Sequence, residues 1–271
     1  MIDIQKNLIT VGIPFYSKTN PAHLREAIDS ILTQSLLPSK IHLIQDGPIP
    51  KEIETLIKKY QKEVPDLFLL LSLEKKGLPH ALNKSISKCK TKYYARMDSD
   101  DIAFKERLEK QVAYLEKETD IDILGGWSVE FKGNNNKEDG FINKRPNDSK
   151  RINEYFHYMN PLIHPTVIFR VEVFEKIGLY NERFYSDQDL ELWGRALKNK
   201  IKISNLQESL LYFRIDGRQK RRSKFSAIRR QIIARYSYNT LSIRLNVLKL
   251  SSIFFRLLPK RIRLWSYKNI R

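Results

Sequence analysis

Two aspartates one residue apart carry the strongest chemical signal in this sequence. Asp98 and Asp100 follow directly after a run of aromatic and apolar residues, where a strand would end. In an extended turn their carboxylates point to the same side, and two such oxygens can hold a hard divalent cation that keeps open positions for nucleotide phosphates. An acidic loop or a helix cap gives the same pattern, and Asp101 is a candidate cap for a helix that begins at Lys105. The choice between a Mg²⁺ or Mn²⁺ site and a solvated loop therefore depends on what surrounds the pair.

The elements before this pair alternate between strand-like and helix-like patterns. The β-rich runs cover 8–16, 40–45, 67–73 and 92–98, and the helical patterns between them cover 24–32, 52–62 and 81–88. This order predicts a mostly parallel sheet with helices on both faces, in which ligands collect beyond the carboxyl ends of the strands. Three of those ends are polar, at Tyr16-Ser17, Asp46-Gly47 and 98–101. We expect them to meet at one edge of the sheet.

The second half of the sequence is less regular. We expect a helix over 105–118, a strand over 121–131, a buried strand over 162–169 and a helix over 186–199. No internal repeat and no long linker is evident before residue 214. The pattern is that of one α/β domain followed by a segment of different composition.

Several ordered segments resemble family 2 glycosyltransferases, above all the subgroup that builds bacterial capsules, exopolysaccharides and lipopolysaccharide. These segments are Thr10–Tyr16, Gln45–Pro48, Gly77–Asn83, Ala95–Asp101, His164–Arg170 and Asp187–Leu190. The likeness spans roughly residues 7–213. It implies a GT-A domain over 1–213, which is a Rossmann-like α/β fold, and an enzyme that moves a sugar from a nucleotide-sugar donor to an acceptor with inversion at the anomeric carbon.

The resemblance also implies a pocket for the donor nucleotide. Pro14 and Tyr16 would line the base pocket, and Asp46 would accept a hydrogen bond from uracil, which favours a UDP-sugar. Asp46 is equally suited to a turn before a glycine. Members of the family often carry Asn where this chain has Lys76 before Gly77, so contacts of that loop with the donor do not carry over. The sugar itself is not identified by the sequence.

The acidic segment gains a defined role through the same resemblance. Asp98 would lie on the nucleotide side and Asp100 would be the favoured direct ligand of a divalent cation, Mn²⁺ or Mg²⁺. Arg96 would face the nucleotide, with a structural ion pair as the equal alternative. Since both metals take oxygen ligands, the residues do not distinguish between them.

A second acidic segment implies the catalytic base. Inverting transfer needs a carboxylate that takes the proton of the acceptor hydroxyl, and the resemblance assigns this role to Asp187, with Asp189 as runner-up. The alternative is that Asp187 only caps the helix that follows. His164 would assist the metal or the acceptor, although a buried histidine bonded to the backbone is the favoured alternative.

The C-terminal segment, 214–271, is strongly basic. It holds 17 Lys or Arg against one acid, Asp216, and the whole chain has a net charge of +18. Within 241–258 most apolar residues lie on one side of a helix, with Lys249 and Arg256 opposite. This predicts an amphipathic helix that binds the glycosyltransferase to an anionic membrane surface, near a glycan or lipid-linked acceptor. Alternatives are a helix packed on the domain with a solvated basic face, and a run from Arg218 that folds over the donor diphosphate.

The amino-acid composition limits which other classes of protein this chain can belong to. The single cysteine, Cys89, excludes an internal disulfide framework and a Cys-rich zinc site. The beginning of the chain carries no signal-like pattern, and no run of 18 uncharged apolar residues occurs, so we expect a cytoplasmic protein, peripheral on the inner face of the cytoplasmic membrane. A nucleic-acid-binding protein would suit the basic segment but leaves the polar strand ends unexplained, and we expect no nucleic-acid partner. A metal-dependent nucleotidyltransferase would use the aspartates but not the 187–190 segment.

Overall fold

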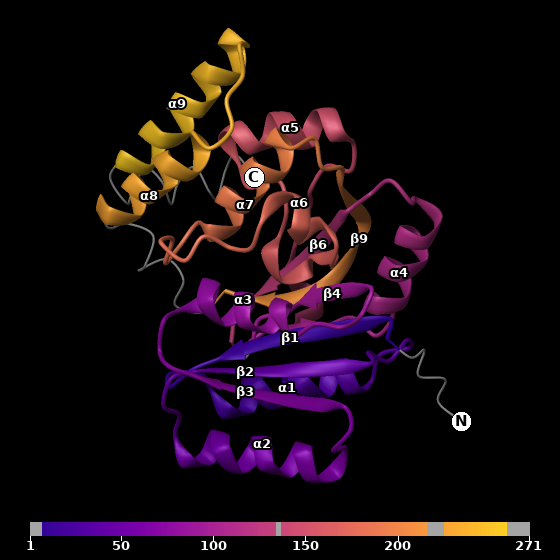
Figure 1. Ribbon diagram of the computed structural model, residues 1–271. Coiled ribbons are helices and arrows are strands. Elements are labelled where there is room, and N and C mark those ends of the chain that lie inside the picture. The colour runs from indigo at the N-terminus through magenta and orange to yellow at the C-terminus, as the bar shows by residue number, and fades with distance from the viewer. Residues whose placement is uncertain (1–6, 134–136, 216–224, 259–271) are drawn as a thin grey trace.

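The computed structural model describes residues 7–133, 137–215 and 225–258 (Figure 1). The first predicted sheet strands are all present: β1 (Ile9–Phe15), β2 (Lys40–Asp46), β3 (Phe68–Leu73) and β4 (Tyr93–Arg96). They pair in parallel in the order β3-β2-β1-β4. Because parallel neighbours end at the same edge, the three polar strand ends lie together as predicted.

The sheet continues beyond β4 as a mixed sheet. Its path runs through β8 (Ile168–Arg170), β6 (Ile123–Phe131) and β9 (Ile203–Arg214) to the two-residue β5 (Ile102–Ala103), and β7 (Phe141–Asn143) pairs with β6. β8 is antiparallel to both of its neighbours, whereas β6 and β9 are parallel. The fold is therefore the expected α/β architecture with a mostly parallel sheet, extended by strands from the second half of the chain.

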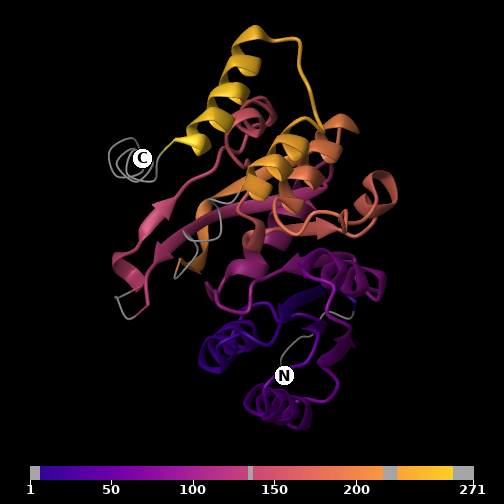
Figure 2. The same cartoon turned by 90° about the vertical axis from the view of Figure 1, so that its left-hand side faces the viewer.

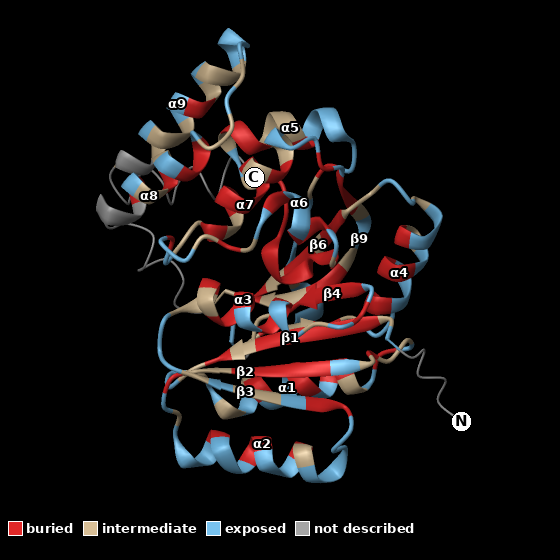
Figure 3. Cartoon of the chain, viewed as in Figure 1, coloured by how far each residue is buried: buried red, intermediate tan, exposed pale blue. Residues whose placement is uncertain are grey.

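Helices cover both faces of the sheet, as Figures 1 and 3 show. The helices are α1 (Pro21–Leu32), α2 (Lys51–Glu63), α3 (Leu78–Ser87), α4 (Arg107–Lys117), α5 (Ser149–Tyr158), α6 (Val173–Ile177) and α7 (Gln188–Lys198). One apolar cluster joins the sheet to α1, α2 and α4, and a second joins it to α3, α5, α6 and α7. Neighbouring residues of β4 alternate between the two, with Tyr93 in the first and Tyr94 in the second.

The structure corrects two of the predicted elements. The expected strand over 162–169 is a 3₁₀ turn, His164–Thr166, followed by only three residues of β8. Pro165 has no N–H to donate to a ladder, and the Thr166 hydroxyl donates to the Ile163 carbonyl at 2.7 Å, which closes the turn. The helix expected from Lys105 begins at Arg107 with Glu106 as its cap residue, so Asp101 does not cap it.

Two helices follow the sheet, α8 (Phe225–Arg235) and α9 (Ile243–Leu257). Figures 1 and 2 draw them beside α5 and α7, and the contacts agree, since α8 packs on α7 and α9 packs on α5. Ala234 of α8 belongs to the second apolar cluster. The division of the chain at residue 213 stays a prediction, and Arg218 lies outside the described residues.

Candidate active site

Three carboxylates lie together beyond the end of β4. Oxygen atoms of Asp98, Asp100 and Asp101 all lie within 4.8 Å of one another. The Met97 amide donates to the Gly12 carbonyl of β1 at 3.1 Å, so the parallel pairing continues to the residue before Asp98. Carboxylate oxygens at this spacing are the ligand type that Mg²⁺ and Mn²⁺ prefer. The donor set therefore fits a hard divalent cation, and the two aspartates predicted to hold it are among the three.

The three carboxylates differ in exposure. Asp101 is fully buried, and it accepts a hydrogen bond from the Arg214 amide at 2.9 Å. The Arg214 side chain donates to the Asp100 carbonyl at 3.0 Å and to Glu26 at 2.7 Å. Asp98 and Asp100 are half-buried. Asp101 thus anchors the end of β9 to the acidic segment, and the accessible ligands are Asp98 and Asp100.

Arg96 lies beneath this segment, with 2% of its surface exposed. Its guanidinium donates to Asp98. Burial opposes the charge of Arg96 most strongly, but Asp98, Tyr180 and Asp101 together outweigh burial and raise the arginine pKa above its ordinary value. These contacts match the ion-pair alternative, and contact with the donor nucleotide stays a prediction.

His164 is buried near Arg96, and its ring bonds to a side-chain hydroxyl instead of the expected backbone group. Its Nε2 shares a hydrogen bond of 2.8 Å with the Tyr180 hydroxyl, and its ring meets Trp193 edge-on. Burial, and then the charge of Arg96, hold the pKa of His164 well below its ordinary value. The ring is therefore uncharged at neutral pH, in keeping with the core role that its surroundings favour.

The predicted nucleotide side is formed by the ends of β1 and β2. Pro14 and Tyr16 are half-buried there. The Asp46 carboxylate accepts hydrogen bonds from the backbone amides of Lys76 at 2.9 Å and Gly77 at 3.1 Å. Gly77 has φ 96° and ψ 171°, a conformation that side chains rarely adopt. Asp46 therefore fixes the glycine turn before α3, and a carboxylate with two oxygens retains capacity to accept from a ligand.

The second acidic segment begins α7. Asp187 has φ 61° and ψ 19°, and within the described chain its side chain makes no capping hydrogen bond to the helix. Asp187 is thus the N-cap residue of α7 through its backbone, while its carboxylate does not cap the helix, and its role as base stays a prediction. The Asp189 carboxylate accepts a hydrogen bond from the side-chain amide of Asn160 at 2.6 Å. Burial, and then the nearby charge of Asp187, raise the pKa of Asp189 above its ordinary value.

Comparison with known proteins agrees with the family that the sequence resembles. The family model described as Glycosyl transferase family 2 matches residues 10–178. The chain belongs to this family. It is 31% identical to the Escherichia coli UDP-Gal:alpha-D-GlcNAc-diphosphoundecaprenol beta-1,3-galactosyltransferase over 269 residues, covering 96% of this chain and 95% of the relative. This glycosyltransferase is therefore an enzyme, and neither a nucleotidyltransferase nor a nucleic-acid-binding protein is favoured.

Solved structures of low sequence identity share the fold. Residues 1–349 of Staphylococcus aureus TarS, in complex with UDP-GlcNAc, match with a TM-score of 0.67 at 15% identity, over 92% of this chain and 72% of that one. The mannosyltransferase PcManGT from Pyrobaculum calidifontis, in complex with GDP-Man and Mn²⁺, matches with a TM-score of 0.63 at 15% identity, over 96% and 72%. The glycosyltransferase thus has the predicted GT-A fold.

Several residues that organise this glycosyltransferase site were not predicted from the sequence. Asn83 of α3 accepts from the Tyr180 amide and donates to its carbonyl, both at 2.9 Å, which ties the third family segment to the loop before α7. Asn160 holds Asp189, and Arg214 holds the acidic segment. Asn83 is the last residue of the Gly77–Asn83 segment that resembles the family. This position was the one sequence signal that could have pointed to Asn83. The contacts of Arg214 span more than a hundred residues and leave no local pattern.

Proposed function

We propose that this glycosyltransferase moves a sugar from a UDP-sugar to a glycan or lipid-linked acceptor with inversion, in the synthesis of bacterial surface polysaccharide. The observation that carries this is that one buried arginine, Arg96, bonds to Asp98 of the acidic cluster and also acts electrostatically on Asp189, whose pKa is raised. This supports placing the proposed metal ligands and the proposed base in one site.

Asp98 and Asp100 are proposed to hold the cation, with Asp100 as its direct ligand. Their half-buried carboxylates fit Mn²⁺ or Mg²⁺. A cation bound there supplies the positive charge that stabilises a departing diphosphate. Pro14, Tyr16 and Asp46 are proposed to hold the uridine. Support for uridine comes from the names of the Escherichia coli relative, a UDP-Gal enzyme, and of the TarS complex with UDP-GlcNAc.

Asp189 is proposed as the base, in place of Asp187, which the sequence placed first. A base works best when its pKa lies near the operating pH, and burial and Asp187 both raise the pKa of Asp189. The acceptor oxygen attacks the anomeric carbon and forms the new bond. The carbon–oxygen bond to the diphosphate breaks and its electron pair leaves with UDP, while the acceptor proton passes to Asp189.

Three experiments test this function. UDP with Mn²⁺ is expected to raise the melting temperature of the protein, whereas duplex DNA is not. A transfer screen over UDP-galactose, UDP-GlcNAc and GDP-mannose, with each metal, then identifies the donor. Asp189→Asn is expected to abolish transfer while UDP and Mn²⁺ still bind. Normal turnover in Asp189→Asn together with an inactive Asp187→Asn would return the base to Asp187.

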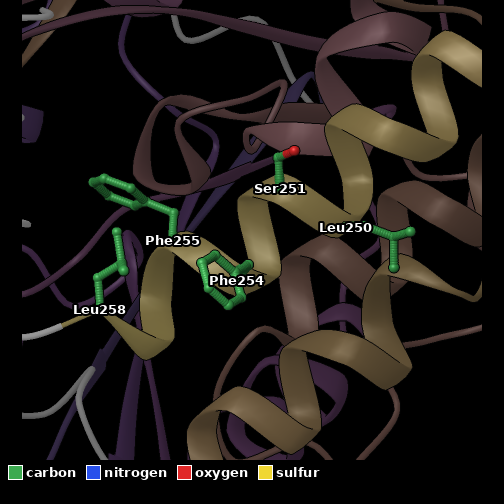
Figure 4. A pocket seen from close by; sticks show the side chains of 5 residues that line it. All are labelled: Leu250, Ser251, Phe254, Phe255 and Leu258. Atoms are coloured by element: carbon green, nitrogen blue, oxygen red, sulfur yellow. The ribbon is translucent and has the colours of Figure 1, made fainter.

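The surface of α9 supports a membrane as the second partner. None of the described helices is long and apolar enough to cross a bilayer. Instead α9 presents an exposed apolar stripe to the outside, with exposed fractions between 55% and 82%. The stripe consists of Ile243, Val247, Leu250 and Phe254. A hollow of about 350 Å³ on this side of α9 is lined by Leu250, Ser251, Phe254, Phe255 and Leu258. Figure 4 labels these side chains. The alternative of a helix packed on the domain is met in part, since α9 packs on α5, but Lys249 is buried instead of lying on a solvated basic face.

We propose that this stripe docks on an anionic lipid surface. The described exposed side of α9 is mostly apolar, with Arg244 and Ser251 as its exposed polar residues, and the sequence on both sides of the helix pair is rich in Lys and Arg. Insertion of the stripe removes apolar area from water, and each nearby cation contributes on the order of 1 kcal/mol on anionic lipid. This would hold the glycosyltransferase at the membrane face where a lipid-linked acceptor lies.

Vesicle flotation tests the docking. The protein is expected to float with phosphatidylglycerol vesicles and much less with phosphatidylcholine vesicles. Replacing Val247, Leu250 and Phe254 together by Ser is expected to abolish flotation. The matched control replaces two exposed apolar residues of β7 by Ser, Phe141 and Ile142, which are 51% and 46% exposed. This control is expected to float as the unchanged protein does. If the protein self-associates without lipid and the triple variant abolishes this self-association, the stripe would instead bind a second copy of the chain.

A further inference from the structure

Two consecutive hydrogen bonds join α8 to the loop in front of α7. Arg230 Nε donates to Ser186 Oγ at 3.1 Å, and Ser186 Oγ donates to Asp187 Oδ2 at 3.1 Å. The direction of both bonds is fixed, because an arginine has no acceptor and a carboxylate has no proton to give. The serine hydroxyl is therefore oriented from both sides.

The backbone conformation of Asp187 requires surrounding contacts that stabilise it. Its left-handed conformation is sparsely populated for residues other than glycine and persists where surrounding contacts determine it. The Asp187 carbonyl accepts the first hydrogen bond of α7, from Glu191 at 3.1 Å. Its carboxylate turns to Ser186 instead of the helix amides. This direction decides where the negative charge lies relative to Asp189.

The helix that supplies Arg230 is itself firmly packed. Ile228 and Ala234 are buried, at 8% and 0% exposure. Arg235 donates to the Phe156 carbonyl of α5 at 2.5 Å. A side chain on such a helix can hold a loop in place, whereas a side chain on a mobile loop could not.

We infer that Arg230 is a positioning residue, which acts through Ser186 to hold the Asp187 carboxylate beside Asp189. This inference rests on the proposed function, since it gives Asp189 the role of base. It makes α8 part of the active site. Turnover then depends on the C-terminal helices, while uptake of the donor does not.

Arg230→Gln tests the inference directly. We expect kcat of transfer to fall about tenfold, because a misplaced charge at the base impairs proton transfer. The KM for the donor and the calorimetric binding of UDP with Mn²⁺ are expected to stay unchanged. Arg230→Lys, which keeps a donor, is expected to recover part of the loss. The matched control is Arg229→Gln, which removes the same charge from the exposed neighbouring position of α8 and leaves kcat unchanged.

A double-mutant cycle separates positioning from a general loss of stability. Ser186→Ala is expected to lower kcat as much as Arg230→Gln, and the double variant no further, because both remove the same link. Normal kcat in either single variant, or additive losses in the double variant, overturns the inference. Ser186→Ala carries the test alone if Arg230→Gln does not fold.

The outcome is distinguishable from a failure of the proposed function. If Asp189→Asn keeps normal turnover, the proposed base is wrong. If Asp189→Asn is inactive and Arg230→Gln has normal kcat, the base stands and only the positioning role of Arg230 fails.

Discussion

The acidic strand end and the C-terminal helix pair are built in opposite ways. At the strand end, Asp98 and Asp100 reach the surface above buried apolar strands. On α9 the order is reversed, since Lys249 is fully buried and Phe254 is 64% exposed. Apolar side chains that are exposed together on a protein surface mark a site where another molecule binds and covers them. The contrast separates the proposed site for a charged donor and cation from the proposed docking surface for lipid.

The buried lysine has a structural explanation. Lys249 Nζ donates to the carbonyls of Arg235 at 3.0 Å and Tyr238 at 2.8 Å, and to the Asn239 side chain at 3.0 Å. These acceptors follow the end of α8, where unpaired carbonyls and the helix dipole favour a cation. Lys249 thus joins α9 to α8 and turns the apolar stripe outward.

The largest expected effect comes from Asp100 at the strand end. Asp100→Ala removes the proposed direct metal ligand, and a metal supplies several kcal/mol of transition-state stabilisation. We expect transfer to fall on the order of a thousandfold. The free energy of unfolding should change by no more than about 0.5 kcal/mol, as for surface substitutions. Steady-state transfer and urea unfolding measure the two quantities.

Asp101→Ala is the matched variant, one residue away. It leaves the buried Arg214 amide without its acceptor, so we expect a loss of about 1–3 kcal/mol in the free energy of unfolding. If Asp100→Ala were the less stable of the two, the assignment of exposed ligand and buried anchor would be reversed.

The strands of the first half could be predicted because buried parallel strands appear as apolar runs between turn residues. β1 to β4 follow this rule, and their shared edge located the acidic site. β9 was not predicted. Its centre, Leu206 to Ser209, is polar and coincides with the register shift against Gly126 and Trp127, which breaks any simple alternation.

The site was predictable where it is local and not where it joins distant segments. The carboxylates of Asp98 and Asp100 are neighbours in sequence. The bond from Arg230 to Ser186 spans 44 residues, and the Asp101 bond to Arg214 spans 113. Such pairs form only when the sheet and the last helices pack, so spacing along the chain does not contain them. The outward turn of α9 was likewise hidden, because an amphipathic pattern does not say which side is covered.

A smaller effect is expected from Lys249 in the helix pair. Lys249→Met keeps the length of the side chain but removes the donor to one buried and two part-buried acceptors, while it also removes a buried charge. Burial, and then Arg235, lower the pKa of Lys249 to about 8, so the charge is already disfavoured. We expect a net loss of about 1 kcal/mol in the free energy of unfolding, measured in urea. Arg244→Met, at an exposed position of α9, is the control and should stay within about 0.5 kcal/mol.

The smallest effect is a shift of the pH profile. The base must be ionised, so kcat/KM is expected to rise with pH through the pKa of Asp189, which lies above the ordinary value because of burial and the charge of Asp187. Asp187→Asn removes that charge, so kcat should fall at least as far as in Arg230→Gln. The substitution also lowers the pKa of Asp189, so the acidic limb should move to lower pH by less than about one unit. Transfer rates measured at saturating metal over the acidic range give the shift. A limb that moves to higher pH, or does not move, would mean that Asp189 is not the titrating base, and the two aspartates would have to exchange roles.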